Sequence, residues 1–117
     1  MDKDVLDLPE FLERVQDDKE LLLELFDIYI QDFKDKRLAL KEAVAANDFE
    51  QIKNLAHSLK GASGNISAKL LRVTFLKFEE MGKNQNLASA SETLALMDQQ
   101  FQDLLNRIAT VKQQLQK

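Results

Sequence analysis

The chain has 117 residues, of which 44% are hydrophobic and 31% charged, a balance typical of a folded domain rather than a disordered segment. It contains no cysteine, which excludes disulfides, thiolate metal sites and a thiol nucleophile. The net charge of −4 argues against nucleic acid or an anionic membrane surface as the main partner. No apolar run reaches the roughly 18 residues of a membrane span. We therefore expect a single domain over residues 1–117, monomeric and located in the cytoplasm.

Two helices are predicted in the first part of the chain. A short one covers residues 8–15, with Asp7 suited to be its N-cap and Pro9 in its first turn. A long one covers residues 18–46. Its apolar residues recur at helical spacing and predict a buried stripe formed by Leu21, Leu22, Leu25, Phe26, Tyr29, Phe33, Leu40 and Val44. Leu23 and Ile30 fall on the flank of this stripe.

Three more helices are predicted after the break at Asn47 and Asp48. The first covers residues 48–64, with Asp48 as its N-cap and its end near Gly64 and Asn65. The next two cover residues 67–83 and 88–114. Their apolar sides comprise Leu70, Leu71, Phe75, Phe78 and Met81 in one, and Leu94, Met97, Phe101, Leu104, Leu105, Ile108, Val111 and Leu115 in the other. Long amphipathic helices with short connections predict an all-α fold, an up-down-up-down antiparallel four-helix bundle with a short extra N-terminal helix.

The chain contains one histidine, His57, and its position on the predicted helix is informative. At about 100° per residue, the apolar positions of this helix gather on one side and His57 lies nearly opposite. The residues that share its face are Lys53, Asn54, Lys60, Gly61 and Gly64. The two glycines are costly within a helix, by roughly 0.5–1 kcal/mol each relative to alanine. This pattern predicts an imidazole that a large partner can reach.

The charge around His57 points to an anion as the ligand. Between Glu50 and Arg72 there are four basic residues and one acidic residue, whereas the whole chain is acidic. Histidine side chains titrate near pH ~6.5, so a neutral, nucleophilic imidazole is available at cellular pH and can accept a phosphoryl group from an acyl phosphate. Lys60, three residues further on, can offer an ammonium group on the same face. The alternative is a solvated helix face with chance lysines.

Other chemistries fit the sequence less well. A structural histidine would be expected on the apolar stripe. A metal site would need further ligands, and only Asp48 and Glu50 lie within a turn or two of His57. A serine hydrolase would need an oriented nucleophile, but Ser58 and Ser63 point elsewhere on the helix. We therefore expect neither a metal ion nor a cofactor.

The segment from Ala56 to Ile66 reads AHSLKGASGNI and resembles the signature of histidine-containing phosphotransfer (HPt) domains, His-x-x-Lys-Gly followed by small residues. Such domains carry phosphoryl groups between receiver domains in phosphorelays. The resemblance implies that His57 is phosphorylated on a ring nitrogen, that Lys60 assists electrostatically, and that Gly61 and Gly64 keep the approach open. It also implies response-regulator receiver domains and a hybrid sensor histidine kinase as partners, with the magnesium ion held by the receiver and no kinase active site in this chain. The chain could be a free shuttle or the cytoplasmic domain of a membrane-bound hybrid kinase.

One position departs from the family pattern, because Ser67 stands where glycine is usual. We expect Ser67 to cap the following helix. We expect a partner to dock around His57, Lys53 and Asn54, on a surface rimmed by apolar residues of the first two helices. The candidates are Phe11, Leu23 and Ile30, and for Phe11 a purely structural role in the core is preferred. Two functional alternatives remain, a helical module that docks receivers or kinases without carrying phosphate, and a plain structural bundle.

Overall fold

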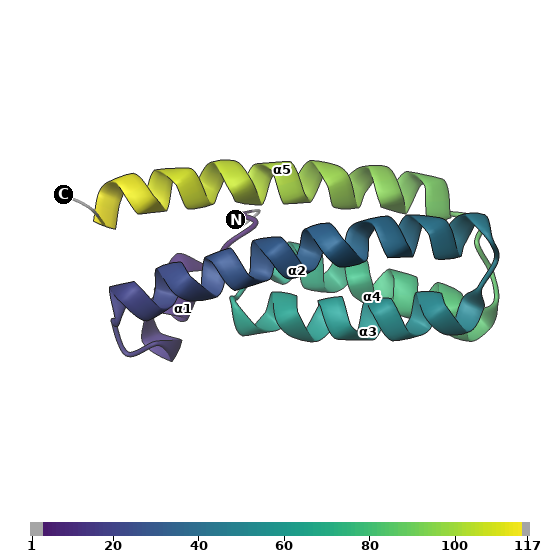
Figure 1. The fold of residues 1–117 in the computed structure, drawn as a ribbon, viewed down its shortest axis with the longest axis horizontal. Helices are drawn as coiled ribbons and strands as arrows, with labels where there is room; N and C mark the ends of the chain where they lie inside the picture. Colours follow the sequence, from purple (N-terminus) through teal and green to yellow (C-terminus); the bar gives the residue numbers. More distant parts are fainter. Residues whose placement is uncertain (1–3, 116–117) are drawn as a thin grey trace.

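The computed structural model describes residues 4–115, and within this range it contains five helices and no strand (Figure 1). The helices are α1 (Leu8–Arg14), α2 (Lys19–Ala45), α3 (Phe49–Asn65), α4 (Lys69–Asn84) and α5 (Ala90–Leu115). Each coincides with a helix predicted from the sequence, with ends that differ by at most two residues. Asp7, Asp18 and Asp48 are the N-caps of the first three, and each side chain accepts a hydrogen bond from a backbone N–H in the first turn.

Helices α2 to α5 form an antiparallel four-helix bundle in which consecutive helices are neighbours and α5 closes the ring against α2. The α3–α4 contact is the most extensive in the bundle. The molecule measures 47 × 25 × 19 Å, so the long dimension is set by α2 and α5, which have 27 and 26 residues. The up-down-up-down bundle predicted from periodicity and short connections is confirmed.

The short helix α1 lies against the N-terminal part of α2 (Figure 1). The ring of Phe11 packs edge-on against Phe26, with centroids 5.2 Å apart, and is completely buried. Of the two roles considered for Phe11, the preferred core role is therefore confirmed and the docking role is wrong. A seven-residue helix cannot stay folded alone, and Phe11 is the residue that ties it to the core.

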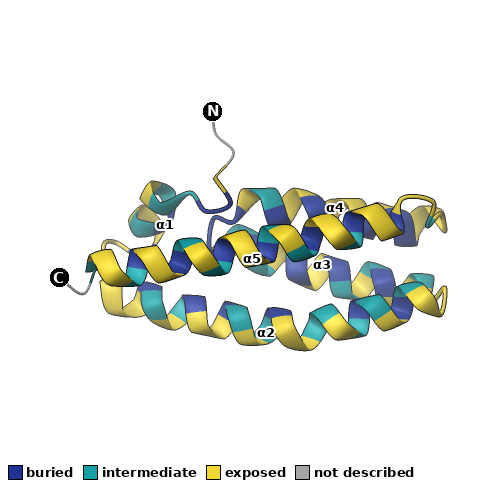
Figure 2. Cartoon of the chain, turned by 90° about the horizontal axis from the view of Figure 1, so that it is seen from above, coloured by how far each residue is buried: buried dark blue, intermediate teal, exposed yellow. Residues whose placement is uncertain are grey.

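The core runs along the bundle axis, as the buried inner faces of the helices in Figure 2 show. Phe33 lies at its centre, stacked on Phe101 at 3.9 Å and edge-on to Phe75 at 5.7 Å. Three positions of α2 differ from the predicted stripe, because Leu21 is 39% exposed and Leu25 and Val44 are only half-buried. Beside Val44, Ala43 faces the core instead. Leu21 belongs to the first turn of α2, beyond most of the bundle, so a residue in phase with the stripe finds little to pack against there.

The buried polar groups of the core are paired. The Tyr29 hydroxyl of α2 and the Ser63 hydroxyl of α3 lie 2.7 Å apart, and burial raises the pKa of Tyr29, so this phenol stays neutral. Among the described residues, no buried side-chain nitrogen or oxygen lacks a hydrogen-bond partner. No helix within residues 4–115 has both the length and the apolar character needed to cross a membrane.

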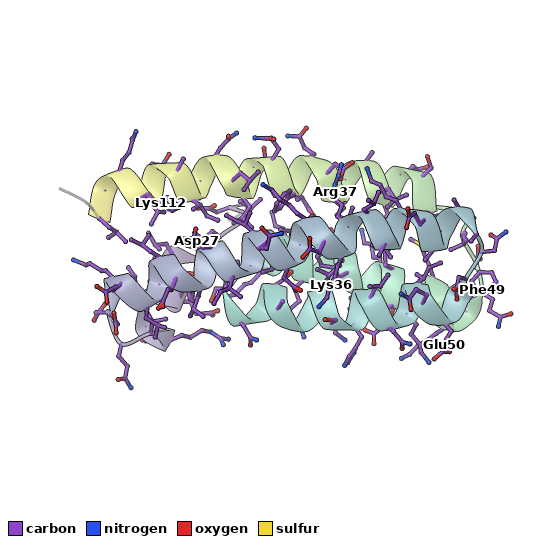
Figure 3. All side chains as sticks on the ribbon, in the orientation of Figure 1. Asp27, Lys36, Arg37, Phe49, Glu50 and Lys112 are labelled. Atoms are coloured by element: carbon purple, nitrogen blue, oxygen red, sulfur yellow. The ribbon has the colours of Figure 1, made fainter. Side chains whose placement is uncertain are left out.

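One glycine brings α3 and α4 into very close contact. A Cβ atom added at Gly82 would lie 2.8 Å from the carbonyl oxygen of Phe49 and 2.9 Å from the backbone nitrogen of Lys53. Phe49 is labelled at the start of α3 in Figure 3, where the last turns of α4 pass beside it. Only glycine allows the two backbones to approach this closely, so Gly82 fixes how far apart the helices lie at this end.

The turn between α3 and α4 contains Ser67 in the left-handed conformation, with φ of 61°, and only 1% exposed. Its hydroxyl donates to Glu10 Oε1 at 2.7 Å, and its carbonyl accepts from the Asp7 N–H at 3.0 Å. The N-cap position of α4 is Ala68, which makes no side-chain cap bond, so the predicted cap role of Ser67 is wrong. The hydroxyl is used instead to hold α1 against the turn, a contact that glycine could not make.

Candidate functional site

His57 lies in the middle of α3 and points away from the core. Its side chain is 71% exposed, while Ala56 and Leu59, on the inner face of the same helix, are completely buried. One turn further along, a Cβ atom added at Gly61 would meet no atom within 4 Å. The imidazole predicted to be accessible is therefore accessible in the structure, and the surface beside it is open.

A carboxylate from the neighbouring helix holds His57 in place. Glu79 of α4 is only 7% exposed, and its Oε2 atom lies 2.9 Å from His57 Nδ1. Its Oε1 atom accepts a hydrogen bond from Lys60 Nζ at 2.6 Å. One carboxylate of α4 therefore bridges two residues of α3 that are three positions apart, and it fixes both side chains relative to each other.

The charge of Glu79 determines where the histidine carries its proton. The hydrogen bond from Lys60 holds the pKa of the Glu79 carboxyl below its usual range, and the contact with His57 adds to this, together outweighing the effect of burial. An ionised carboxylate can only accept hydrogen bonds, so Nδ1 of His57 must be the donor. In a neutral imidazole this assigns the lone pair to Nε2, the nitrogen that a reacting group can use.

Glu79 is the functional residue that the sequence analysis missed. It lies 22 residues further along the chain, on a different helix, so residue spacing within the His57 helix cannot reveal it. A signal was nevertheless present, since Glu79 lies four and eight residues after Phe75 and Leu71 and therefore continues their buried stripe. A buried carboxylate on an apolar helix face requires a partner.

The other predicted site residues are arranged unequally around His57. Lys60 is part of the Glu79 bridge, whereas Lys53 pairs with Glu50 at 3.5 Å and Asn54 is exposed. Gly64 is not simply open, because the side chain of Arg72 lies over it, with Cδ 3.4 Å from the position of an added Cβ. The role of Gly61 and Gly64 in access stays a prediction, with open space at Gly61 and the stem of Arg72 lying over Gly64.

The two sides of the His57 face differ in their apolar residues. On α2, the docking candidates Leu23 and Ile30 are half-buried and pack against the core, while Ile28, which the sequence analysis did not single out, is 63% exposed. Lys36 of α2 reaches α3, where its Nζ donates to Ser58 Oγ at 2.6 Å (Figure 3). On α4, Val73 and Leu76 are exposed.

Nothing in the described part of the chain is arranged as a metal site, since no three histidine, aspartate or glutamate residues within residues 4–115 gather closely enough to hold an ion. At His57, one ring nitrogen is held by a carboxylate and the side chain is 71% exposed, an arrangement that suits a nucleophile.

Comparison with known proteins agrees with this geometry. The family model described as "Hpt domain" matches residues 24–111, which include α3, α4 and the His57 site. The chain belongs to the Hpt domain family. This membership confirms the resemblance found in the segment from Ala56 to Ile66.

Two Hpt relatives show how far the similarity extends. Histidine-containing phosphotransfer protein 1 of Oryza sativa subsp. japonica is 29% identical over 66 residues, which cover 56% of this chain and 45% of that protein. The chain thus spans less than half the length of this curated relative in the match. The crystal structure of histidine-containing phosphotransfer protein B from Pseudomonas aeruginosa PAO1 superposes with a TM-score of 0.76, at 25% identity and over 99% of both chains.

Proposed function

We propose that this chain is a phosphoryl carrier whose His57 accepts a phosphoryl group from the aspartyl phosphate of a receiver domain and passes it to another receiver. The observation that carries the proposal is the bridge from Glu79 to His57 and Lys60, because it fixes an exposed imidazole in the tautomer that leaves Nε2 unprotonated. Membership of the Hpt family and the printed names of the two relatives support it.

In the transfer step, the lone pair of His57 Nε2 forms a bond to phosphorus while the bond between phosphorus and the aspartate oxygen breaks. The receiver's carboxylate departs with the electron pair, and no proton has to move. The imidazole ring becomes cationic, because Nδ1 keeps its proton while Nε2 gains the phosphoryl group. The Glu79 carboxylate, 2.9 Å from Nδ1, stabilises the positive charge as it develops. Transfer back to an aspartate follows the same path in reverse.

Lys60 serves two purposes in this proposal. Its ammonium group balances the charge of Glu79 at 2.6 Å and places a cation beside the incoming phosphoryl group. The chain supplies the nucleophile and its positioning, and the receiver supplies the metal ion and its own acidic site. The expected partners are therefore receiver domains and a hybrid sensor histidine kinase, with the carrier a monomer in the cytoplasm and without a kinase active site of its own.

The proposal is tested by transfer of radiolabelled phosphate from a panel of phosphorylated receiver domains to the chain and to the His57→Gln variant. His57 is exposed, so the variant should keep the fold, which circular dichroism would check. Label should reach the wild type only, and the labelled bond should break in acid and survive in base. Label on the His57→Gln variant would contradict the assignment. Binding of receivers to both proteins without any label would favour the docking module that carries no phosphate.

A further inference from the structure

A groove beside His57 carries an excess of positive charge. It lies between the second half of α3, the first turns of α4 and α1, with Gly61 and Gly64 in its wall. Its charged residues are four bases and one acid, namely Arg14, Lys60, Lys69, Arg72 and Glu10. This is unexpected for a chain with a net charge of −4. We propose that the groove, with Arg72 as its anchor, holds the acidic surface of the receiver domain on the α3–α4 side of His57. The inference rests on the proposed function.

Arg72 is the cation of the groove that remains available. Lys60 pairs with Glu79, while Lys69 and Arg14 both pair with Glu10, at 2.9 and 3.6 Å. Arg72 forms no ion pair or side-chain hydrogen bond with any residue from 4 to 115, although it is exposed. A guanidinium group offers five donors in a planar fork that matches carboxylates and phosphates, and here all of them remain for a partner.

Gly64 gives Arg72 its position. The stem of the arginine lies across α3 at this residue, with Cδ and Nε 3.4 and 3.6 Å from where a Cβ atom would be. A side chain at position 64 larger than alanine would occupy this space and push the arginine away. The absence of a side chain at Gly64 therefore lets the stem of Arg72 pack against α3. Because the stem is already laid down on α3, binding orders fewer rotamers of the side chain.

Apolar residues continue the same surface towards His57. Val73 lines the groove and is 48% exposed, and Leu76, three residues further, is 37% exposed. Leu76 is three residues before Glu79, so on α4 it lies between the groove and the carboxylate that holds His57. A basic anchor next to apolar residues and continuous with the reactive group is the composition expected of a docking surface.

The receiver matches this surface in charge. An aspartyl phosphate is itself strongly anionic, and its metal ion must be held by further carboxylates, so the receiver's surface at the transfer site is acidic. On the opposite side of His57, Lys36 is already engaged by Asp32 and Ser58. Charge complementarity therefore favours the α4 side over the α2 side for the acidic partner.

The test is phosphotransfer from a receiver that labels the wild type, measured as a function of receiver concentration. Arg72→Glu should raise the half-saturating concentration about tenfold, with the maximal rate unchanged, and the effect should shrink as salt is added. Lys77→Glu is the matched control, because it makes the same charge change on an exposed position of α4 outside the groove. Equal effects of the two variants, or no effect of Arg72→Glu, would overturn the inference.

A second pair of variants distinguishes the two sides of His57. Leu76→Ser should raise the half-saturating concentration several-fold, and Ile28→Ser, at a more exposed apolar residue of α2, should leave it unchanged. The reverse result would place the receiver on α2 and overturn the inference.

The proposed function is checked separately by labelling His57 with phosphoramidate, a small phosphodonor that needs no docking. Wild type and Arg72→Glu should label equally. If no receiver labels the wild type, both the proposed function and the docking groove are contradicted. If receivers label the wild type and Arg72→Glu equally well, only the docking groove is contradicted.

Discussion

Gly82 and Gly61 both belong to the α3–α4 pair, but they serve opposite purposes. Gly82 lets the two helices pack closely, whereas Gly61 leaves the surface beside His57 uncovered. At the end of the pair near Phe49, a Cβ atom added at Gly82 would lie only 2.8 Å from the Phe49 carbonyl oxygen, so the missing side chain lets α4 pack closely against the α3 backbone. In the second half of α3, a Cβ atom added at Gly61 would have no neighbour within 4 Å, and the side chain of His57, one turn away, is 71% exposed. The same residue type therefore serves packing in one place and exposure in the other. The sequence position of a glycine does not tell which, because that depends on whether a neighbouring helix passes over it.

The largest expected effect is on the free energy of unfolding, which the alanine substitutions at Gly82 and Gly61 should change in opposite directions. Gly82→Ala forces two backbones apart, and such overpacking costs about 1–3 kcal/mol, more than the helix preference of alanine returns. Gly61→Ala meets no atom and should stabilise the chain by about 0.5–1 kcal/mol. Urea unfolding followed by circular dichroism measures both. Stabilisation by Gly82→Ala would show that α3 and α4 can move apart at Gly82 at little cost, and it would contradict the packing role of this glycine.

The next largest effect is on the transfer rate, and it tests whether the contact from Glu79 of α4 to His57 of α3 contributes to phosphotransfer. Glu79→Gln keeps the shape of the side chain but removes the charge that fixes the His57 tautomer. A hydrogen bond to a charged group contributes about 1.5–3 kcal/mol, so the transfer rate should fall roughly tenfold or more. Glu80→Gln, at the adjacent exposed position, is the control and should change nothing. Equal rates for both variants would mean that Glu79 only fills space.

The smallest effect concerns the pKa of Glu79. Lys60 lowers it most, so Lys60→Met should move it upward towards the ordinary glutamate range, which carboxyl NMR titration would detect. Because the pKa in the folded chain is lower than in the unfolded chain, the ionised bridge stabilises the fold above the unfolded value. This contribution is lost as the pH falls through the folded value. An unchanged titration in Lys60→Met would show that His57 or the backbone, not Lys60, sets the charge of Glu79.

The helices and the exposed face of His57 could be predicted because both depend on spacing within a single segment of chain. Glu79 could not be paired with His57 in this way, since the pairing depends on the register of α4 against α3, which close packing at Gly82 helps to set. For Phe11, the core role could be preferred but not separated from docking, because a short amphipathic helix offers the same apolar pattern to a core and to a partner. For Ser67, the conformation of the turn decides whether the hydroxyl faces its own helix or α1.

The bond between Glu79 and Nδ1 has a further consequence for how long a signal lasts. On the proposed mechanism, the phosphorylated ring is cationic while Glu79 holds the Nδ1 proton, and it can depart as a neutral imidazole. A leaving group that departs without charge is a good one, so the proton that Glu79 keeps on Nδ1 assists unloading, while the attraction between the carboxylate and the cationic ring is given up in that step. A phosphorylated chain would then be short-lived, and the duration of a response would be set by the proteins that load and unload it, not by storage of the phosphoryl group on His57.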